Sequence, residues 1–291
     1  MPRRITHTDG RPIIIYDSTR EMVETARAYV SAPLPPDAGD TARRWHATAE
    51  VYARQDRPRF LGKCASLDEA AAACNERAPA EIAKKARELE DKWRRETQTA
   101  PRVKWTREEQ GTDIITEAAL APYALAPDRL FRRRRRIPAP SPRVTIVFPA
   151  GLSASYSAKD YADRAYILAA AASVLTAKGY SVAIYAEFTE RSFGRRTHTV
   201  FYPLKRHSEP LSTASLYFGT RPDTARRARF IQICKEQADM PFDPGLGKPE
   251  AIGKKAACRA LGIPEAGTTY FPAAATPQDM LSELHLATRT A

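Results

Sequence analysis

Two serines near the middle of the chain could cap a helix or hold an anion. Ser153 and Ser155 follow residues 143–148, a β-branched apolar run typical of a buried strand. An Ala-rich segment, expected to be helical, begins near residue 158. Amide groups and the dipole at a helix start favour negative charge, so helix capping and anion binding both remain open for Ser153 and Ser155.

The same loop lacks the carboxylates that a divalent cation needs. Gly151 precedes the two serines, while Asp160 and Asp163 fall inside the expected helix. Hard cations bind through carboxylate oxygens, and Mg²⁺ usually takes one or two of them. We therefore expect no metal and no other cofactor at this loop.

Arginines are the second group of residues that could do chemistry. Five are adjacent, and such a row favours a partner that neutralises it, with phosphates as the expected partner. Phe131 stands beside the row without other aromatic residues, which argues against a dedicated single-strand module. The residues predicted to bind nucleic acid are Arg132, Arg133, Arg134, Arg135, Arg136, Arg195, Arg196, Arg226 and Arg227.

The overall charge agrees with an acidic partner. The chain has 46 Lys and Arg against 34 Asp and Glu, a net charge of +12 that is shared by its two halves. Such an excess favours DNA or RNA. Three alternatives remain open: the arginines meet an acidic protein surface, they form a solvated connector, or their row pairs with the acidic face of the 80–97 helix.

Enzyme motifs are largely missing. Neither GxxxxGK[ST] nor a GxGxxG after the strand occurs, which excludes a P-loop NTPase and leaves dinucleotide binding unsupported. Residues 151–155 approach a G-x-S-x-G elbow, but Ser155 replaces its last glycine. A hydrolase with Ser153 as nucleophile and His207 as base is kept as a third alternative.

Cysteine spacing and hydropathy bear on the compartment. The four cysteines form no CxxC pair, so a compact zinc site is not expected. Cys74 and Cys234 lie in amphipathic helix patterns, where a buried thiol is usual, and we expect reduced cysteines and a cytoplasmic protein. No apolar run of about 18 residues occurs, and no apolar segment follows the basic N-terminus. We therefore expect neither a membrane span nor a secretory signal.

Periodicity predicts an α/β fold. Strand 143–148, helix 158–178 and strand 180–185 form a βαβ unit, which is parallel in nearly all cases. A strand at 197–205, helices at 222–237 and 250–261, and a last strand at 268–271 follow. We predict a Rossmann-like, mostly parallel sheet flanked by helices in residues 143–291. A mainly helical region over 1–125 and a Pro- and Arg-rich linker over 126–142 precede it.

The loop also carries a resemblance to a family. A strand followed by Leu152-Ser153-Ala154-Ser155 and a helix resembles a von Willebrand factor A domain, in which Asp-x-Ser-x-Ser helps to hold a divalent ion. Gly151 stands where the aspartate is expected. The resemblance implies an A-domain-like fold with a degenerate metal site.

The chain as a whole is similar to an uncharacterised family of phage and prophage proteins, which pairs a helical N-terminal region with an A-domain-like half. The residues that carry this similarity are Asp17-Ser18, Trp45, Phe60-Leu61-Gly62, Ser66-Leu67-Asp68-Glu69-Ala70, residues 151–155, and Arg226-Arg227 with Phe230. The similarity implies a host-cell cytoplasmic or virion location.

These observations favour a non-enzymatic basic protein that binds nucleic acid with little sequence selectivity. A protein-interaction or virion-associated module is the alternative.

Overall fold

The computed structural model describes residues 2–7, 10, 12–55, 64–72, 78–96, 104–108, 113–114, 131–135, 142–151, 157–192, 195–236, 248–273 and 275–290. Within these ranges the side chains of 104–135, 190–197, 225, 248–249 and 290 are not described. The chain divides into two compact units, one formed by residues 1–97 with 143–291 and the other by residues 98–142.

A mixed sheet, seven-stranded in the described part of the chain, organises the larger unit. β10, β6 and β7 run parallel to one another, β2 runs parallel to β8, and β7 and β8 form an antiparallel hairpin. β1 and β9 are attached by antiparallel pairing. The strand order is β1 (Arg3–Thr6), β2 (Pro12–Ile15), β8 (Arg195–Lys205), β7 (Ser181–Ser192), β6 (Arg143–Pro149) and β10 (Thr268–Tyr270), with β9 (Lys248–Glu250) on β7.

The predicted βαβ unit is confirmed. β6 and β7 are parallel with Ile146 opposite Ile184, and α7 (Ala158–Ala177) connects them. α7 begins after Ser157, whose amide and hydroxyl both donate to the Asp160 carboxylate at 2.7 Å. Gly179 follows the helix with a φ of 91°, a conformation that glycine adopts without strain.

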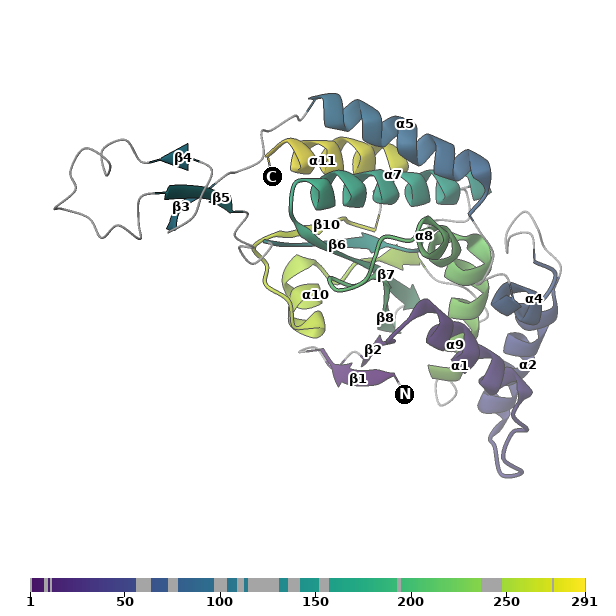
Figure 1. Ribbon diagram of the computed structural model, residues 1–291. Coiled ribbons are helices and arrows are strands. Elements are labelled where there is room, and N and C mark those ends of the chain that lie inside the picture. The colour runs from purple at the N-terminus through teal and green to yellow at the C-terminus, as the bar shows by residue number, and fades with distance from the viewer. Residues whose placement is uncertain are drawn as a thin grey trace. The chain divides into compact units, whose positions relative to one another are not determined.

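Helices cover the sheet unequally. Figure 1 shows α7, α11 (Pro277–Thr290) and α5 (Ala80–Glu96) on one side of the sheet and α10 (Lys254–Leu261) on the other. The first face carries the main hydrophobic cluster, and α10 covers a smaller one. The helices with residues in the main cluster are α1 (Thr19–Ser31), α2 (Asp40–Arg54), α4 (Leu67–Ala72), α5 (Ala80–Glu96), α7, α8 (Thr213–Thr220), α9 (Arg229–Glu236) and α11 (Pro277–Thr290).

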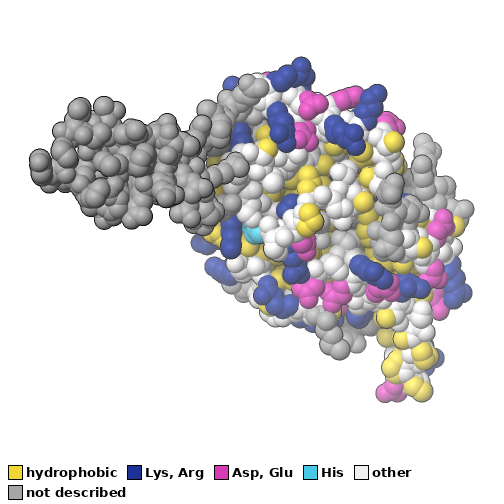
Figure 2. Space-filling model, in the orientation of Figure 1, with side chains coloured by type: hydrophobic (Ala, Val, Ile, Leu, Met, Phe, Trp, Pro, Cys, Tyr) yellow, Lys and Arg dark blue, Asp and Glu magenta, His cyan; other side chains and the backbone are white. Residues whose placement is uncertain are grey.

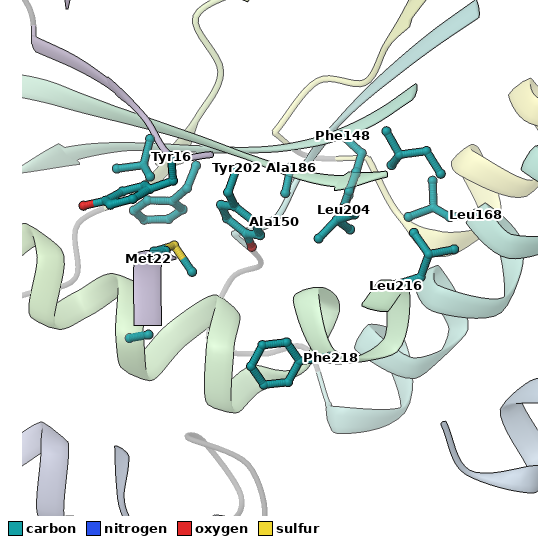
Figure 3. Packing of buried hydrophobic residues seen from close by; sticks show 14 of the residues in the cluster. Tyr16, Met22, Phe148, Ala150, Leu168, Ala186, Tyr202, Leu204, Leu216 and Phe218 are labelled. Carbon is teal, nitrogen blue, oxygen red and sulfur yellow. The ribbon is translucent and has the colours of Figure 1, made fainter. Parts of the chain in front are cut away.

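The Ala-rich composition of α7 follows from its central position. Residues 167–172 are all buried, because α7 packs against α5, α8 and α11 as well as the sheet. A helix that is apolar on nearly every side is one that is buried, and small side chains let its neighbours approach. Figure 3 shows Phe148 and Leu204 of the sheet near Leu168 of α7 and Leu216 of α8.

The N-terminal part of the chain belongs to the sheet. β2 lies beside β8, with Ile14 opposite Val200, and α1 packs against α9. The bounds of the compact units differ from the predicted division into a mainly helical region over 1–125, a linker over 126–142 and an α/β domain over 143–291. The smaller unit holds an antiparallel sheet of β3 (Lys104–Glu108), β5 (Phe131–Arg135) and β4 (Asp113–Ile114).

Two helices begin or continue differently from the expectation. The segment expected to be one helix over 222–237 is π-helical over η3 (Asp223–Ala228) before α9 begins. π-helical turns are short insertions that sequence periodicity does not signal. The helix expected from residue 250 begins at Lys254, because β9 extends to Glu250.

Assignment to the von Willebrand factor A fold is more specific than assignment to the α/β class, and it stays a prediction. The α/β class, with helices flanking the sheet, is confirmed.

Candidate functional site

The end of β6 is where the sequence places a site, and its backbone there is crowded. Gly151 is buried, and a Cβ at this position would lie 2.7 Å from Cε2 of Phe188 and 3.3 Å from Nη1 of Arg229. Real Cβ atoms do not approach a ring that closely. Position 151 therefore has no room for the aspartate that the A-domain resemblance would put there.

The surroundings of Gly151 are cationic and aromatic. The guanidinium of Arg229 lies over the ring of Phe188, and both side chains lie beside Gly151. Aromatic faces attract such cations. Burial raises the pKa of Tyr202, and the positive charge of Arg229 opposes this rise. This end of β6 presents groups that disfavour a bound cation.

Arg164 of α7 ties this end of the sheet together. Its side chain is 1% exposed and donates to the carbonyls of Pro149, in β6, and of Ala275, after β10, the latter at 2.6 Å. Arg164 joins the carboxyl ends of the neighbouring strands β6 and β10, whose following helices α7 and α11 lie on the same side of the sheet.

The two serines predicted to cap α7 are not at its N-cap position. Ser153 and Ser155 lie outside the described residues. Ser157 holds the N-cap position of α7, which corrects the assignment of that position to Ser153 or Ser155. Their anion-binding role stays a prediction.

His207 lies at the other end of the strands. Its Nδ1 is 2.9 Å from the carbonyl of Ser181, and its Nε2 is 3.4 Å from the hydroxyl of Thr145. Both residues lie near the beginnings of β7 and β6, while Gly151 follows the end of β6. Burial lowers the pKa of His207. The arrangement gives no support to a hydrolase in which this histidine activates Ser153.

The predicted arginines fall into three groups. Arg132, Arg133, Arg134 and Arg135 belong to the backbone of β5, and Arg195 and Arg196 to that of β8, but their side chains lie outside the described residues. Arg136 lies outside them entirely. Nucleic-acid contact by these residues stays a prediction.

Arg226 and Arg227 form the third group, and their placement on a basic surface is corrected. Their side chains are buried, with 2% and 0% exposed. Arg227 donates to the carbonyls of Tyr52, Ala53 and Cys64, which joins η3 to the end of α2 and the segment before α4. A polyanion outside the fold cannot reach a guanidinium held in this way.

A basic pocket at the beginning of α10 was not found from the sequence. It is lined by His7, residues 252–256 and Arg259, and its volume is about 380 Å³; the name α10 pocket is used for it below. Lys254, Lys255 and Arg259 are exposed and form no ion pair with the described residues. A Gly-Lys-Lys triplet followed by arginine at the start of a helix is the signal that could have indicated it.

The wall of the α10 pocket is fixed from inside the sheet. The amide of Ile252 donates to the Glu187 carboxyl at 2.9 Å, and the amide of Gly253 donates to the Tyr270 hydroxyl at 2.9 Å. The Glu187 carboxyl also accepts from Thr189. Burial raises the pKa of Glu187, although these hydrogen bonds oppose the shift. The loop before α10 is thereby held at two successive amides.

The surface charge is mixed elsewhere. Figure 2 shows Lys and Arg side chains spread over the visible face among Asp and Glu side chains. Within the described residues no cluster of three or more His, Cys, Asp or Glu is arranged to hold a metal. No described helix has the length and apolar character required to cross a membrane.

Comparisons with known proteins place the chain by family. No curated protein and no solved structure matches it. A family model matches residues 6–286, which include both compact units almost entirely. The chain therefore belongs to the family described as "Domain of unknown function (DUF7192)".

Proposed function

We propose that this protein is a non-enzymatic binder of nucleic acid that contacts the phosphate backbone with little sequence selectivity. The observation that carries the proposal is the group of exposed cations at the α10 pocket, formed by Lys254, Lys255 and Arg259 with His7 beside them. Cations that have no carboxylate partner among the described residues are available to phosphates.

Low selectivity follows from the kind of groups present. Lysine and arginine side chains at a helix start recognise charge and phosphate oxygens, which every nucleotide carries. The pocket lining contains no Phe, Tyr or Trp on which a base could stack. The arginines of β5 and of the β7–β8 hairpin extend the proposed contact set, whereas the buried Arg226 and Arg227 are removed from it.

The salt dependence of binding tests the proposal. Lys254, Lys255 and Arg259 are replaced by glutamine together, and affinity for a single-stranded oligonucleotide is measured from 50 to 200 mM salt, roughly the range over which phosphate contacts are lost. The slope of log K against log salt should fall by up to about 2, since each single-strand contact contributes about 0.7. A wild-type protein without salt-sensitive affinity contradicts the proposal.

A matched control separates local contact from net charge. Lys84, Arg87 and Lys92 are exposed on α5, two lysines and one arginine as in the pocket. Their triple glutamine variant removes the same charge and should leave the slope close to the wild-type value. Equal losses in both variants would show that charge alone, without the α10 pocket, drives binding.

Binding of an acidic protein, in place of nucleic acid, is the alternative function. A pull-down repeated after nuclease treatment distinguishes the two. A partner that survives the nuclease and is lost in the pocket variant favours protein interaction over nucleic acid.

The proposal includes an A-domain-like fold and a cytoplasmic location. An A-domain-like fold with a lost metal site is supported by the crowding at Gly151. A cytoplasmic location is supported by the buried thiols of Cys64, Cys234 and Cys258. A phage origin, with a virion or host-cell location, has the sequence resemblance as its support.

A further inference from the structure

We propose that the α10 pocket receives a terminal phosphate, the phosphate monoester at the end of a nucleic-acid strand. This rests on the proposed function and specifies which phosphate the pocket takes. Three structural features carry it: the donors at the start of α10, the rigid support of the loop before it, and the size and lining of the pocket.

The first feature is a set of donors that converge on one place. The first hydrogen bond of α10 runs from the Ala257 amide to the Gly253 carbonyl, and no side chain caps the helix. The amides of Lys254, Lys255 and Ala256 therefore have no acceptor among the described residues. Together with the side chains of Lys254, Lys255 and Arg259 they match three phosphate oxygens and a charge near −2.

The second feature is that the loop is held before any ligand arrives. Gly253 has a φ of 88° and a ψ of 153°, a conformation that is essentially restricted to glycine. Its amide is bound to Tyr270, and the preceding amide is bound to Glu187. The donors of the next turn are thus oriented by the sheet, which reduces the ordering that binding would otherwise require.

The third feature is the space itself. The hollow has a volume of about 380 Å³, is wide open to solvent and has room for a phosphate group. A continuous strand is usually tracked by a groove with aromatic platforms, and Phe, Tyr and Trp are absent from this lining. A chain end enters such a pocket with its doubly charged group, whereas an internal diester carries one charge and two flanking sugars.

The test compares two oligonucleotides that differ only at one end. Single strands of identical sequence, labelled at the 3′ end, carry either a 5′-phosphate or a 5′-hydroxyl, and affinity is measured by fluorescence anisotropy. We expect the 5′-phosphorylated strand to bind about tenfold more tightly, as one additional charge-assisted contact would give. Equal affinities overturn the inference and leave general nucleic-acid binding intact.

A variant that keeps every charge tests the site. Gly253→Ala places a side chain at the positive φ and should displace the amides of the first turn. The preference for the 5′-phosphate, measured as the ratio of the two affinities, should be lost. If Gly253→Ala does not fold, the glutamine variant of Lys254, Lys255 and Arg259 is used instead; it weakens binding of both strands and should bring their two affinities to the same value. A preference that persists in the folded variants overturns the inference.

A failure of the proposed function is recognised separately. If neither strand binds, general nucleic-acid binding is contradicted. Calorimetric titration with a nucleoside 5′-monophosphate then shows whether the α10 pocket binds a phosphate monoester. Binding of the monophosphate, abolished in the glutamine variant, supports a phosphate monoester site. If titration with the monophosphate gives no binding heat, the inference is contradicted as well.

Discussion

The guanidinium of Arg164 donates to the carbonyl of Ala275 at 2.6 Å and also to the carbonyl of Pro149. One side chain of α7 therefore connects the end of β6 with the segment after β10. Parallel strands are usually joined through helices, and here the helix that follows β6 also fastens the neighbouring strand.

Replacing Arg164 tests this clamp. Arg164→Met should lower the free energy of unfolding by about 3 kcal/mol, because two buried carbonyls lose a charged donor. Arg164→Lys should cost less, since an ammonium keeps the charge but cannot span both carbonyls as a planar guanidinium does. Urea unfolding followed by circular dichroism measures both. Equal losses in the two variants would contradict a role for the forked geometry.

Restoring the aspartate of the A-domain pattern should destabilise the protein. In Gly151→Asp the new Cβ meets Phe188 at 2.7 Å, and a buried carboxylate is added. We expect a loss of about 3 kcal/mol and no binding of Mg²⁺ by isothermal titration.

Gly39 is the matched control for that change. Gly39 is the N-cap of α2, its φ is −65°, and a Cβ added at this position would have no heavy atom within 4 Å. Gly39→Asp should therefore stabilise by a few tenths of a kcal/mol, about 0.3, as a helix cap. A Gly151→Asp variant as stable as Gly39→Asp, or one that binds metal, would contradict the crowding at the end of β6.

Glu187 should make stability depend on pH. Burial raises its pKa in the folded state above the unfolded value near 4.5. A group of this kind favours folding most below the unfolded pKa, and its contribution is lost as the pH rises through the folded pKa. The melting temperature of the wild type, relative to that of Glu187→Gln, should therefore fall as the pH is raised from about 4 to 8.

Glu283 provides the comparison for Glu187. It is exposed on α11, so Glu283→Gln should follow the wild-type profile closely across the same pH range. Differential scanning calorimetry measures the melting temperatures of the wild type and of both variants at each pH. A Glu187→Gln profile parallel to the wild type would show that the buried carboxyl does not control the pH dependence.

Local sequence determined the elements that local forces form. The β-branched run at 143–148, the Ala-rich segment and the glycine after it specify β6, α7 and the turn to β7, because strand burial, helix propensity and a left-handed stop act over a few residues. The antiparallel hairpin of β7 and β8 extended this unit beyond the predicted strand end, since pairing with a partner strand lengthens both.

Tertiary structure decided which polar groups face solvent and which elements share a core. Nothing in an arginine pair distinguishes the buried Arg227 from an exposed one, because its carbonyl partners come from residues more than 160 positions away. β2 joins β8 across a similar separation, and the α10 pocket combines His7 with residues 252–259. Such contacts depend on how distant segments pack, and short-range patterns in the chain carry no record of that packing.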